Sequence, residues 1–562
     1  MVAIMYVEHV RHTVNARTYE QVLLRETYRE AGAPRSAVKH RTLLNLTHYD
    51  PADVAAIEWA LKHKGSLEGM GEMAFGAVRT RQGPSVGSVW VLYQVAERIG
   101  LAQALGPSQE GRRALWQVLA RLIDQGSRLS AVRLAQEHGA CAVLGLEPFD
   151  EEALYRNLDW LDERQAHIEQ ALYRRRGGSQ TGHLFLYDVT SSYLEGVCNA
   201  YAAFGYNRDG KRRKRQIVVG LLTDAQGTPL STQVFAGNTQ DPKTVEAQIR
   251  KLVERFGVKE VTLVGDRGML KSLQLDLLVA EGFHYLTAIT KPQIDTLLKA
   301  GVLQMEMFDE HLGEVCVEEM RYLVRRNPMR VDELAAQRED KFHTLVERAR
   351  ERTCYLAQHR KAQPDTALGA VRACAQSLLI ASWAHVDVCR REVRVVRDDA
   401  ALADVSRLDG CYVLKTDVAP AHATAETLHA RYKDLGLVEQ AFRTSKTGHL
   451  ELRPIYVRTK AHTRGHVFVV MLAYLLRREL ARAWRKLDTT VEEGLEKLNS
   501  LCATEVIFPS GARCLTIPEP RDTLACLFDA MDVSPPMALP KSYGVVATKQ
   551  KLPPHRKRPE TA

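Results

Sequence analysis

Hydrophobic residues recur at intervals of three and four along residues 88–177, which is the spacing of helices that bury one face. The pattern is clearest in SVWVLYQVAERIGLAQAL, ALWQVLARLIDQGSRLSAVRLAQEHG and EEALYRNLDWLDERQAHIEQALYRRR. We therefore predict a helical domain there. Residues 1–87 contain short alternating segments and a helix that begins at Asp50 and Pro51, a favourable N-cap and first-turn pair. We predict a small α+β module for this part.

Short apolar runs typical of strands replace the helical pattern after residue 177. Strands are expected at 184–187, 220–224, 229–237, 261–265 and 285–289. A helix that starts at Asp241 and Pro242 follows the third strand, and another, around 271–281, follows the fourth. Three strands, a helix, a strand, a helix and a strand is the element order of an RNase H-like fold, an α/β class with a mixed sheet flanked by helices. In that topology the first and fourth strands lie side by side.

Two of these predicted strands end in an aspartate. Asp188 follows LFLY and Asp266 follows VTLVG. Neighbouring strands would bring the two carboxylates together, and carboxylates at strand ends can hold a divalent metal. Thr190 lies on the same strand face as Asp188. We interpret Asp241 as a helix cap rather than a metal ligand.

The sheet is interrupted after Thr290 by about 120 residues that contain helical, apolar and strand-like parts. A structureless loop of that length is uncommon, so we predict an inserted subdomain. The predicted catalytic core thus has a first part at 178–290, an insertion at 291–410 and a second part at 411–485. Residues 486–562 form a C-terminal region whose tail, KQKLPPHRKRPETA, is basic and expected to be disordered.

The segment TAETLHARYKDLGLVEQAFRTSK predicts one helix over 424–446. At about 100° per residue, Glu439 shares a face with Tyr432, Arg443 and Lys446. A solvated row of ion pairs would give the same pattern, because Glu439 and Arg443 are four residues apart. The alternative is that the helix carries a third carboxylate to the two aspartates.

Composition and charge limit the partners, the metal sites and the cellular compartment that we expect. The chain has 562 residues, a formal charge of +9 and ten scattered cysteines without a CxxC pair, so an acidic partner is permitted and a zinc site is not favoured. Free thiols suit a reducing cytosol. No run of about 18 apolar residues and no signal-peptide pattern is present, so we expect a cytoplasmic protein without membrane contact.

Three motifs, YDVTSSYLEG, TLVGDRGM and YKDLGLVEQAFRTSKTGHLELRPIYVRTKAHTRGHVFV, resemble bacterial insertion-sequence transposases of the DDE class. They are similar to the subgroup with a Y-x2-R-x3-E-x6-K signature, which Tyr432, Glu439 and Lys446 match in order and spacing. The position of the signature arginine, which the resemblance implies holds DNA phosphate, is Leu435. Arg443, Arg431 or Lys433 could substitute, and of these only Arg443 lies on the same face as Glu439.

The resemblance implies a DNA transposase that binds terminal inverted repeats and performs cut-and-paste transposition. Asp188, Asp266 and Glu439 would be its catalytic and metal-binding residues, with two Mg²⁺ ions that Mn²⁺ could replace. Cleavage would free a 3′-hydroxyl, form a hairpin intermediate and end with strand transfer into target DNA. Two DNA ends imply a homodimer in the synaptic complex.

Further residues are candidates for DNA contact. Tyr432, Arg443 and Lys446 would lie near the scissile phosphate, and a basic run between the first two strands could track phosphates or be a solvated loop. That run comprises Arg208, Lys211, Arg212, Arg213, Lys214 and Arg215. Trp383 could stack on a flipped base, although its apolar surroundings favour a core position. Arg453, Arg464 and His466 could extend the DNA track.

Two alternatives to a transposase remain at this stage. A structure-specific nuclease of RNase H-like fold needs the same carboxylates but neither the N-terminal region nor the insertion. A transposase-derived, non-catalytic DNA-binding protein would explain the departure at Leu435, although the intact carboxylate trio argues against it. The helices of 88–177 could bind transposon ends, or they could simply pack together, because no recognition-helix signature stands out.

Overall fold

The computed structural model describes residues 4–14, 17–28, 38–63, 78–178, 184–211, 213–258, 261–446, 449–508 and 513–539. The predictions for Arg212 and for the basic tail lie outside these residues. The chain divides into two compact units, one formed mainly by residues 1–83 with 502–518, the other mainly by residues 84–501 with 519–536. Each unit is described by itself.

The first unit contains two three-stranded sheets. One has the order β1-β2-β3, built from Ile4–Val14, Arg17–Tyr28 and Lys39–Asn45, and is followed by α1, Pro51–His63. Asp50 accepts a hydrogen bond from the Ala52 N–H at 2.8 Å, as expected of a cap. The other has the order β16-β15-β4, built from Arg513–Thr516, Cys502–Ile507 and Arg79–Ser85. Strands from both ends of the chain therefore share one sheet.

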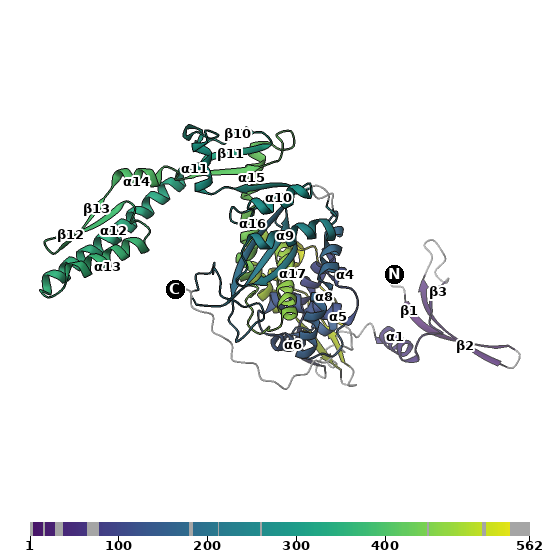
Figure 1. The fold of residues 1–562 in the computed structure, drawn as a ribbon. Helices are drawn as coiled ribbons and strands as arrows, with labels where there is room; N and C mark the ends of the chain where they lie inside the picture. The colour runs from purple at the N-terminus through teal and green to yellow at the C-terminus, as the bar shows by residue number, and fades with distance from the viewer. Residues whose placement is uncertain are drawn as a thin grey trace. The chain divides into compact units, whose positions relative to one another are not determined.

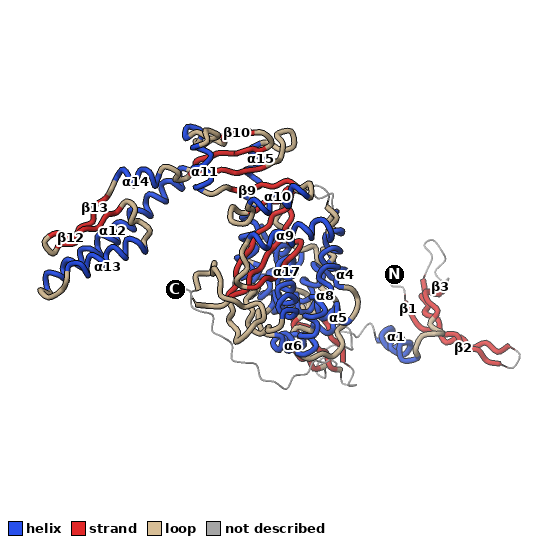
Figure 2. The backbone as a smooth tube through the Cα atoms, viewed as in Figure 1, coloured by secondary structure: helices blue, strands red, loops and turns tan. Residues whose placement is uncertain are grey.

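Residues 87–175 are helical, as predicted (Figure 2). The helices are α3 Gly87–Arg98, α4 Leu101–Leu105, α5 Gln109–Ile123, α6 Arg128–Glu137, α7 Ala140–Leu144 and α8 Glu151–Arg175. Ser108, Ser127 and Asp150 cap α5, α6 and α8 by accepting backbone N–H groups with their side chains. Their apolar faces meet around the fully buried Trp116.

An eight-stranded mixed sheet forms the centre of the second unit, in the order β10-β11-β14-β9-β8-β5-β6-β7. Its strands are β5 Leu184–Tyr193, β6 Gln216–Asp224, β7 Pro229–Ala236, β8 Thr262–Gly265, β9 His284–Ala288, β10 Gly313–Val317, β11 Met320–Arg326 and β14 Cys411–Thr416. β5 pairs antiparallel with β6 and parallel with β8. The predicted element order and the adjacency of the first and fourth strands are confirmed.

Helices cover both faces of this sheet (Figure 1). Phe185, Tyr187 and Val189 of β5 join a buried core with α9, Pro242–Arg250, and α10, Ser272–Ala280. Because side chains alternate along a strand, Asp188 and Thr190 lie on the opposite face. That face is covered by α16, Leu435–Lys446, and α17, Lys460–Ala483. Asp188 therefore faces the helix that carries Glu439.

The predicted insertion at 291–410 has two structural parts. β10 and β11 extend the central sheet through β14, which sequence patterns did not reveal. The rest has its own core and contains α12 Pro328–Gln358, α13 Pro364–Ser377, β12 Ala384–Cys389, β13 Glu392–Arg397 and α14 Asp399–Ser406. The helix and strand segments expected within it are present.

The helix predicted over 424–446 is broken into two. α15, Ala425–Lys433, ends at Asp434, and α16 begins at Leu435. The Asp434 side chain binds Arg431 at 3.0 Å, and Gly436 follows, so the break combines two residues of low helix propensity. The prediction of one unbroken helix over 424–446 was therefore wrong.

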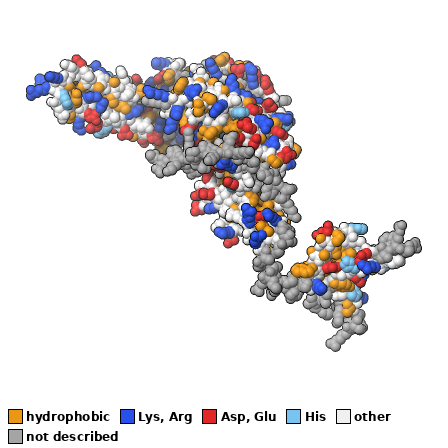
Figure 3. All heavy atoms as spheres, turned by 90° about the horizontal axis from the view of Figure 1, so that it is seen from below, with side chains coloured by type: hydrophobic (Ala, Val, Ile, Leu, Met, Phe, Trp, Pro, Cys, Tyr) orange, Lys and Arg blue, Asp and Glu red, His pale blue; other side chains and the backbone are white. Residues whose placement is uncertain are grey.

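The remaining elements complete the chain. They are α11 Lys291–Lys299, α18 Val491–Asn499, α19 Asp522–Ala530, a π-helix at Lys251–Arg255 and 3₁₀ turns at Met305–Met307 and Trp484–Lys486. All ten cysteines lie in the described residues and are free thiols. None of the described helices is long and apolar enough to span a membrane. Figure 3 shows basic and acidic side chains intermixed over one face, so no single basic surface stands out in that view.

Candidate active site

The two aspartates come from adjacent parallel strands. Tyr187 of β5 is level with Gly265 of β8, and each is followed directly by an aspartate. Asp188 and Asp266 are therefore neighbours across the sheet, as predicted. Asp188 lies within β5, which continues to Tyr193, rather than at its end. Asp266 does follow the last residue of its strand.

The third carboxylate lies on α16, whose two faces are sharply different. Val438, Ala441, Phe442 and Ser445 are buried at the spacing of one helical face. Leu437 contacts Gly227 of the β6–β7 turn, where φ is +71° and an added Cβ would collide with the leucine. These contacts hold α16 against the sheet. The polar face of α16 is left uncovered, and Glu439 on it is exposed to solvent.

A cleft of about 470 Å³ lies between the sheet and this polar face. Its walls include Asp188, Asp266 and Glu439 together with Thr190, Arg208, Asp241, Phe442, Arg443 and Lys446. Tyr432 reaches the same place from α15, where its hydroxyl donates to Asp266 Oδ1 at 3.4 Å. The structure thus brings all three predicted carboxylates to one cleft, although the glutamate helix is broken.

Two basic side chains in the cleft are held by acidic partners that the sequence did not reveal. Arg208 pairs with Asp241 at 2.5 Å, and Lys446 pairs with Asp209 at 2.7 Å. Asp241 precedes α9, but its side chain makes no capping hydrogen bond, so the cap interpretation was wrong for the carboxylate. Arg443 also lines the cleft and forms no ion pair with any described residue.

The carboxylates influence one another electrostatically. Burial raises the pKa of Asp188 to about 7, and the negative charges of Asp266 and Glu439 add to the rise. The Val189 N–H, which donates to Asp188 Oδ1 at 2.7 Å, and the Arg208 guanidinium act in the opposite direction. Asp188 is therefore an acid whose ionised form lacks enough positive charge nearby.

This donor set suits a divalent cation, because hard oxygen ligands favour Mg²⁺ and Mn²⁺ and a cation would relieve the repulsion. Glu439 makes no hydrogen bond or ion pair with the described residues, so its oxygens are accessible to a ligand. Within the described part of the chain, no three His, Cys, Asp or Glu side chains are gathered closely enough to hold a metal as they stand. Sharing one ion among all three carboxylates would require them to move closer together.

We expect the Asp188→Asn variant to be more stable than the original protein at pH 8 without divalent metal. The pKa of Asp188 is raised from 3.8 to about 7, so the folded protein binds this proton more tightly than the unfolded chain does. The stability that comes from the bound proton is complete below pH 4 and is lost as the pH rises through 7. At about 1.4 kcal/mol per pKa unit, the asparagine variant should gain on the order of 2 to 4 kcal/mol in the free energy of unfolding at pH 8.

Thermal unfolding at pH 5 and pH 8 measures this effect, and the gain should shrink at the lower pH. Asp276→Asn, on the exposed side of α10, is the matched control and should change stability little at either pH. A pH-independent gain for Asp188→Asn would contradict the electrostatic account.

The other residues that were predicted to contact DNA do not line the cleft, apart from Arg208. Lys211, Arg213, Lys214 and Arg215 are exposed, and of the described basic run only Arg208 lines the cleft. Arg453 pairs with Glu195 at 2.7 Å and with Glu451. Arg464 pairs with Asp162 at 2.5 Å, and His466 is buried. These three side chains are therefore engaged within the protein.

Trp383 belongs to the core of the inserted subdomain. It is 2% exposed and stacks on Phe342, with ring centroids 5.8 Å apart. Stacking on a flipped base would require the indole to leave this core. We therefore assign Trp383 to packing.

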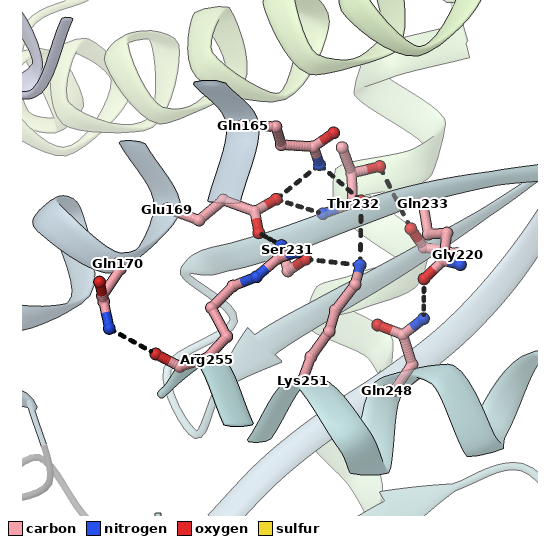
Figure 4. A network of polar contacts seen from close by, with 10 residues as sticks. All are labelled: Gln165, Glu169, Gln170, Gly220, Ser231, Thr232, Gln233, Gln248, Lys251 and Arg255. Atoms are coloured by element: carbon pink, nitrogen blue, oxygen red, sulfur yellow. Dashed lines mark hydrogen bonds and ion pairs between the residues drawn. The ribbon is translucent and has the colours of Figure 1, made fainter. Parts of the chain in front are cut away.

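A buried polar network supports the sheet from the side of α8 (Figure 4). Glu169, whose side chain is fully buried, pairs with Arg255 and accepts hydrogen bonds from Gln165 at 2.7 Å and from the Thr232 N–H at 3.2 Å. Lys251 donates to Ser231 at 2.8 Å, and burial lowers its pKa to about 8. The network ties the helical region to β7 and to the π-helix after α9.

Comparisons with known proteins identify two described families along the chain. Residues 180–476 match the family described as transposase DDE domain, and residues 9–69 match the N-terminal domain of IS1634 family transposases. A solved structure, a piggyBac transposase synaptic complex with hairpin DNA, is similar at 8% identity over 69% of each chain, with a TM-score of 0.34. A search of curated proteins found no match.

The first of these matches spans more than half of the chain and includes Asp188, Asp266 and Glu439. Membership of the subgroup with the Y-R-E-K signature stays a prediction. The chain therefore belongs to the DDE transposase family, as a transposase of an insertion sequence.

Proposed function

We propose that this transposase cuts and joins DNA with Asp188, Asp266 and Glu439 as its carboxylate set. The observation that carries the proposal is the register of β5 and β8, which makes the two aspartates neighbours beneath the polar face of α16. The family uses divalent metal ions. For this chain we propose two Mg²⁺ ions, which would activate water or a 3′-hydroxyl and stabilise the leaving oxygen.

Asp188, Asp266 and Glu439 would hold the ions, and the remaining cleft residues would bind and orient the DNA. The Tyr432 hydroxyl, which contacts Asp266, would keep that carboxylate oriented toward the cleft. Arg443 would contact a phosphate in place of the signature arginine, since Leu435 is half-buried and does not line the cleft. Arg208 and Lys446 would exchange their acidic partners for DNA phosphates.

We infer that residues 9–69 and the helical region of 87–175 bind the inverted repeats at the transposon ends. Successive hydrolysis, hairpin formation and strand transfer at one site are proposed steps, as are a homodimeric synaptic complex and a cytoplasmic location. Each step uses the same chemistry, because water and a 3′-hydroxyl are equivalent nucleophiles for in-line displacement at phosphorus.

A strand-transfer assay tests this function. Purified protein would be mixed with labelled transposon-end DNA, a target plasmid and Mg²⁺, and the products separated on a denaturing gel. We expect cleaved ends and ends joined to the target. Cleavage without joining would favour the structure-specific nuclease, and end binding without cleavage would favour the non-catalytic DNA-binding protein.

A further inference from the structure

A second, much smaller pocket shares no lining residue with the cleft and lies where α5 and α6 meet the segment that follows the glutamate helix. Arg121, Arg128 and His466 line it, and each is only 5% exposed. Its volume is about 20 Å³, which is space for about one water-sized sphere. Three basic side chains thus surround a space of atomic size.

Neither guanidinium in this pocket forms an ion pair with a described carboxylate, although the charges of Glu451, which also lines the pocket, and of Asp124 act favourably on Arg121. Arg121 donates to the Gln125 carbonyl at 2.8 Å, and its Nε has no acceptor. Arg128 Nη2 lies 3.4 Å from His466 Nδ1, and its Nε also has no acceptor. The nearby Glu451 is already engaged by Arg453.

His466 adds a third donor. Burial and the two arginines lower its pKa well below the ordinary value, so the ring is neutral. A neutral ring that accepts from Arg128 at Nδ1 carries its proton on Nε2, and Nε2 has no hydrogen-bond partner. The backbone of Leu452 and Glu451 acts on the ring in the opposite direction. Three N–H groups on residues that line this pocket therefore lack an acceptor at hydrogen-bond geometry.

Without a bound anion, these buried charges and donors destabilise the folded protein. Burial and the charge of Arg121 lower the pKa of Arg128 to about 9, which still leaves it protonated at neutral pH. Two buried like charges repel each other, and each buried donor without an acceptor destabilises the folded state. A hydrogen-bonded water could satisfy the donors but would not neutralise the charge.

We propose that this pocket binds one monatomic anion of the size of chloride, held by Arg121, Arg128 and His466. The small volume excludes phosphate and carboxylate ligands, whose central atom and oxygens need several times this space. The proposal does not depend on the proposed DNA chemistry.

The bound anion would hold the segment after α16 in place. Glu451 has a left-handed backbone with φ of +49°, which is strained for a glutamate. The next residue, Leu452, donates its N–H to the Ser445 carbonyl of α16 at 2.9 Å. The site would therefore stabilise the end of the helix that carries Glu439.

Thermal unfolding of the full-length protein tests the proposal, with sodium chloride or bromide compared with sodium gluconate at equal ionic strength. We expect the halides to raise the unfolding temperature by at least about 2 °C, in a saturable manner. Arg128→Met should abolish this dependence. Arg156→Gln, on the exposed face of α8, should retain it.

Crystals grown in bromide provide a measurement that does not need the variant to fold. An anomalous peak between Arg121 and Arg128 would support the proposal. A water without anomalous signal at that position would overturn it, as would equal unfolding temperatures in halide and gluconate or a retained halide effect in Arg128→Met.

Discussion

The Asp266→Asn and Glu439→Gln variants should each lose metal-dependent cleavage of transposon-end DNA by more than about 100-fold. Loss of a residue that merely orients a metal ligand typically costs 10- to 100-fold, and these two side chains are proposed as ligands themselves. Both substitutions keep the shape of the side chain and remove its negative charge. Initial rates of strand cleavage in Mg²⁺, measured on denaturing gels, provide the test.

Binding of the transposon ends should persist in both variants, because the proposed end-binding regions lie elsewhere in the chain. Gel-shift assays without divalent metal would measure it. Glu426→Gln, on the exposed side of α15, is the matched control and should cleave at the normal rate. Undiminished cleavage by Asp266→Asn or Glu439→Gln would remove that residue from the site.

Glu169→Gln should destabilise the second unit by about 3 to 5 kcal/mol, because breaking a buried ion pair leaves its partner uncompensated. Glutamine retains the size of the side chain but lacks the charge that faces Arg255 and Lys251. It also presents an amide N–H₂ to groups that donate hydrogen bonds, the Gln165 amide and the Thr232 N–H. Denaturant unfolding followed by circular dichroism would measure the loss.

The control for this experiment lies on the same helix. Glu163→Gln changes an exposed glutamate of α8 by the same chemistry and should alter the free energy of unfolding by less than about 0.5 kcal/mol. If the two variants unfolded alike, the network in Figure 4 would contribute little to stability.

That Asp188 and Asp266 lie next to each other was predictable, because their adjacency follows from strand order alone. An apolar run followed by an acid is a local pattern, and the order of elements then decides which strands are adjacent. The helical region was predictable for a similar reason, since its apolar spacing is regular over almost 90 residues.

Features that depend on tertiary contacts were not predictable. A fixed 100° step assumes one unbroken helix, whereas a turn at Asp434 interrupts it, although Asp434 and Gly436 were visible as weak helix formers. The partners of Arg208 and Lys446 come from other parts of the chain. Nothing local marks Asp241 as a cleft residue or Asp209 as the partner of Lys446.

The strand order of the central sheet has a consequence for synthesis on the ribosome. β9 needs β14 as its outer neighbour, yet β14 emerges about 130 residues later. At roughly 5 to 20 residues per second, the edge of β9 stays unpaired for about 6 to 26 s. An open edge strand invites pairing with other chains. The nascent transposase is therefore most vulnerable to aggregation while the inserted subdomain is being made.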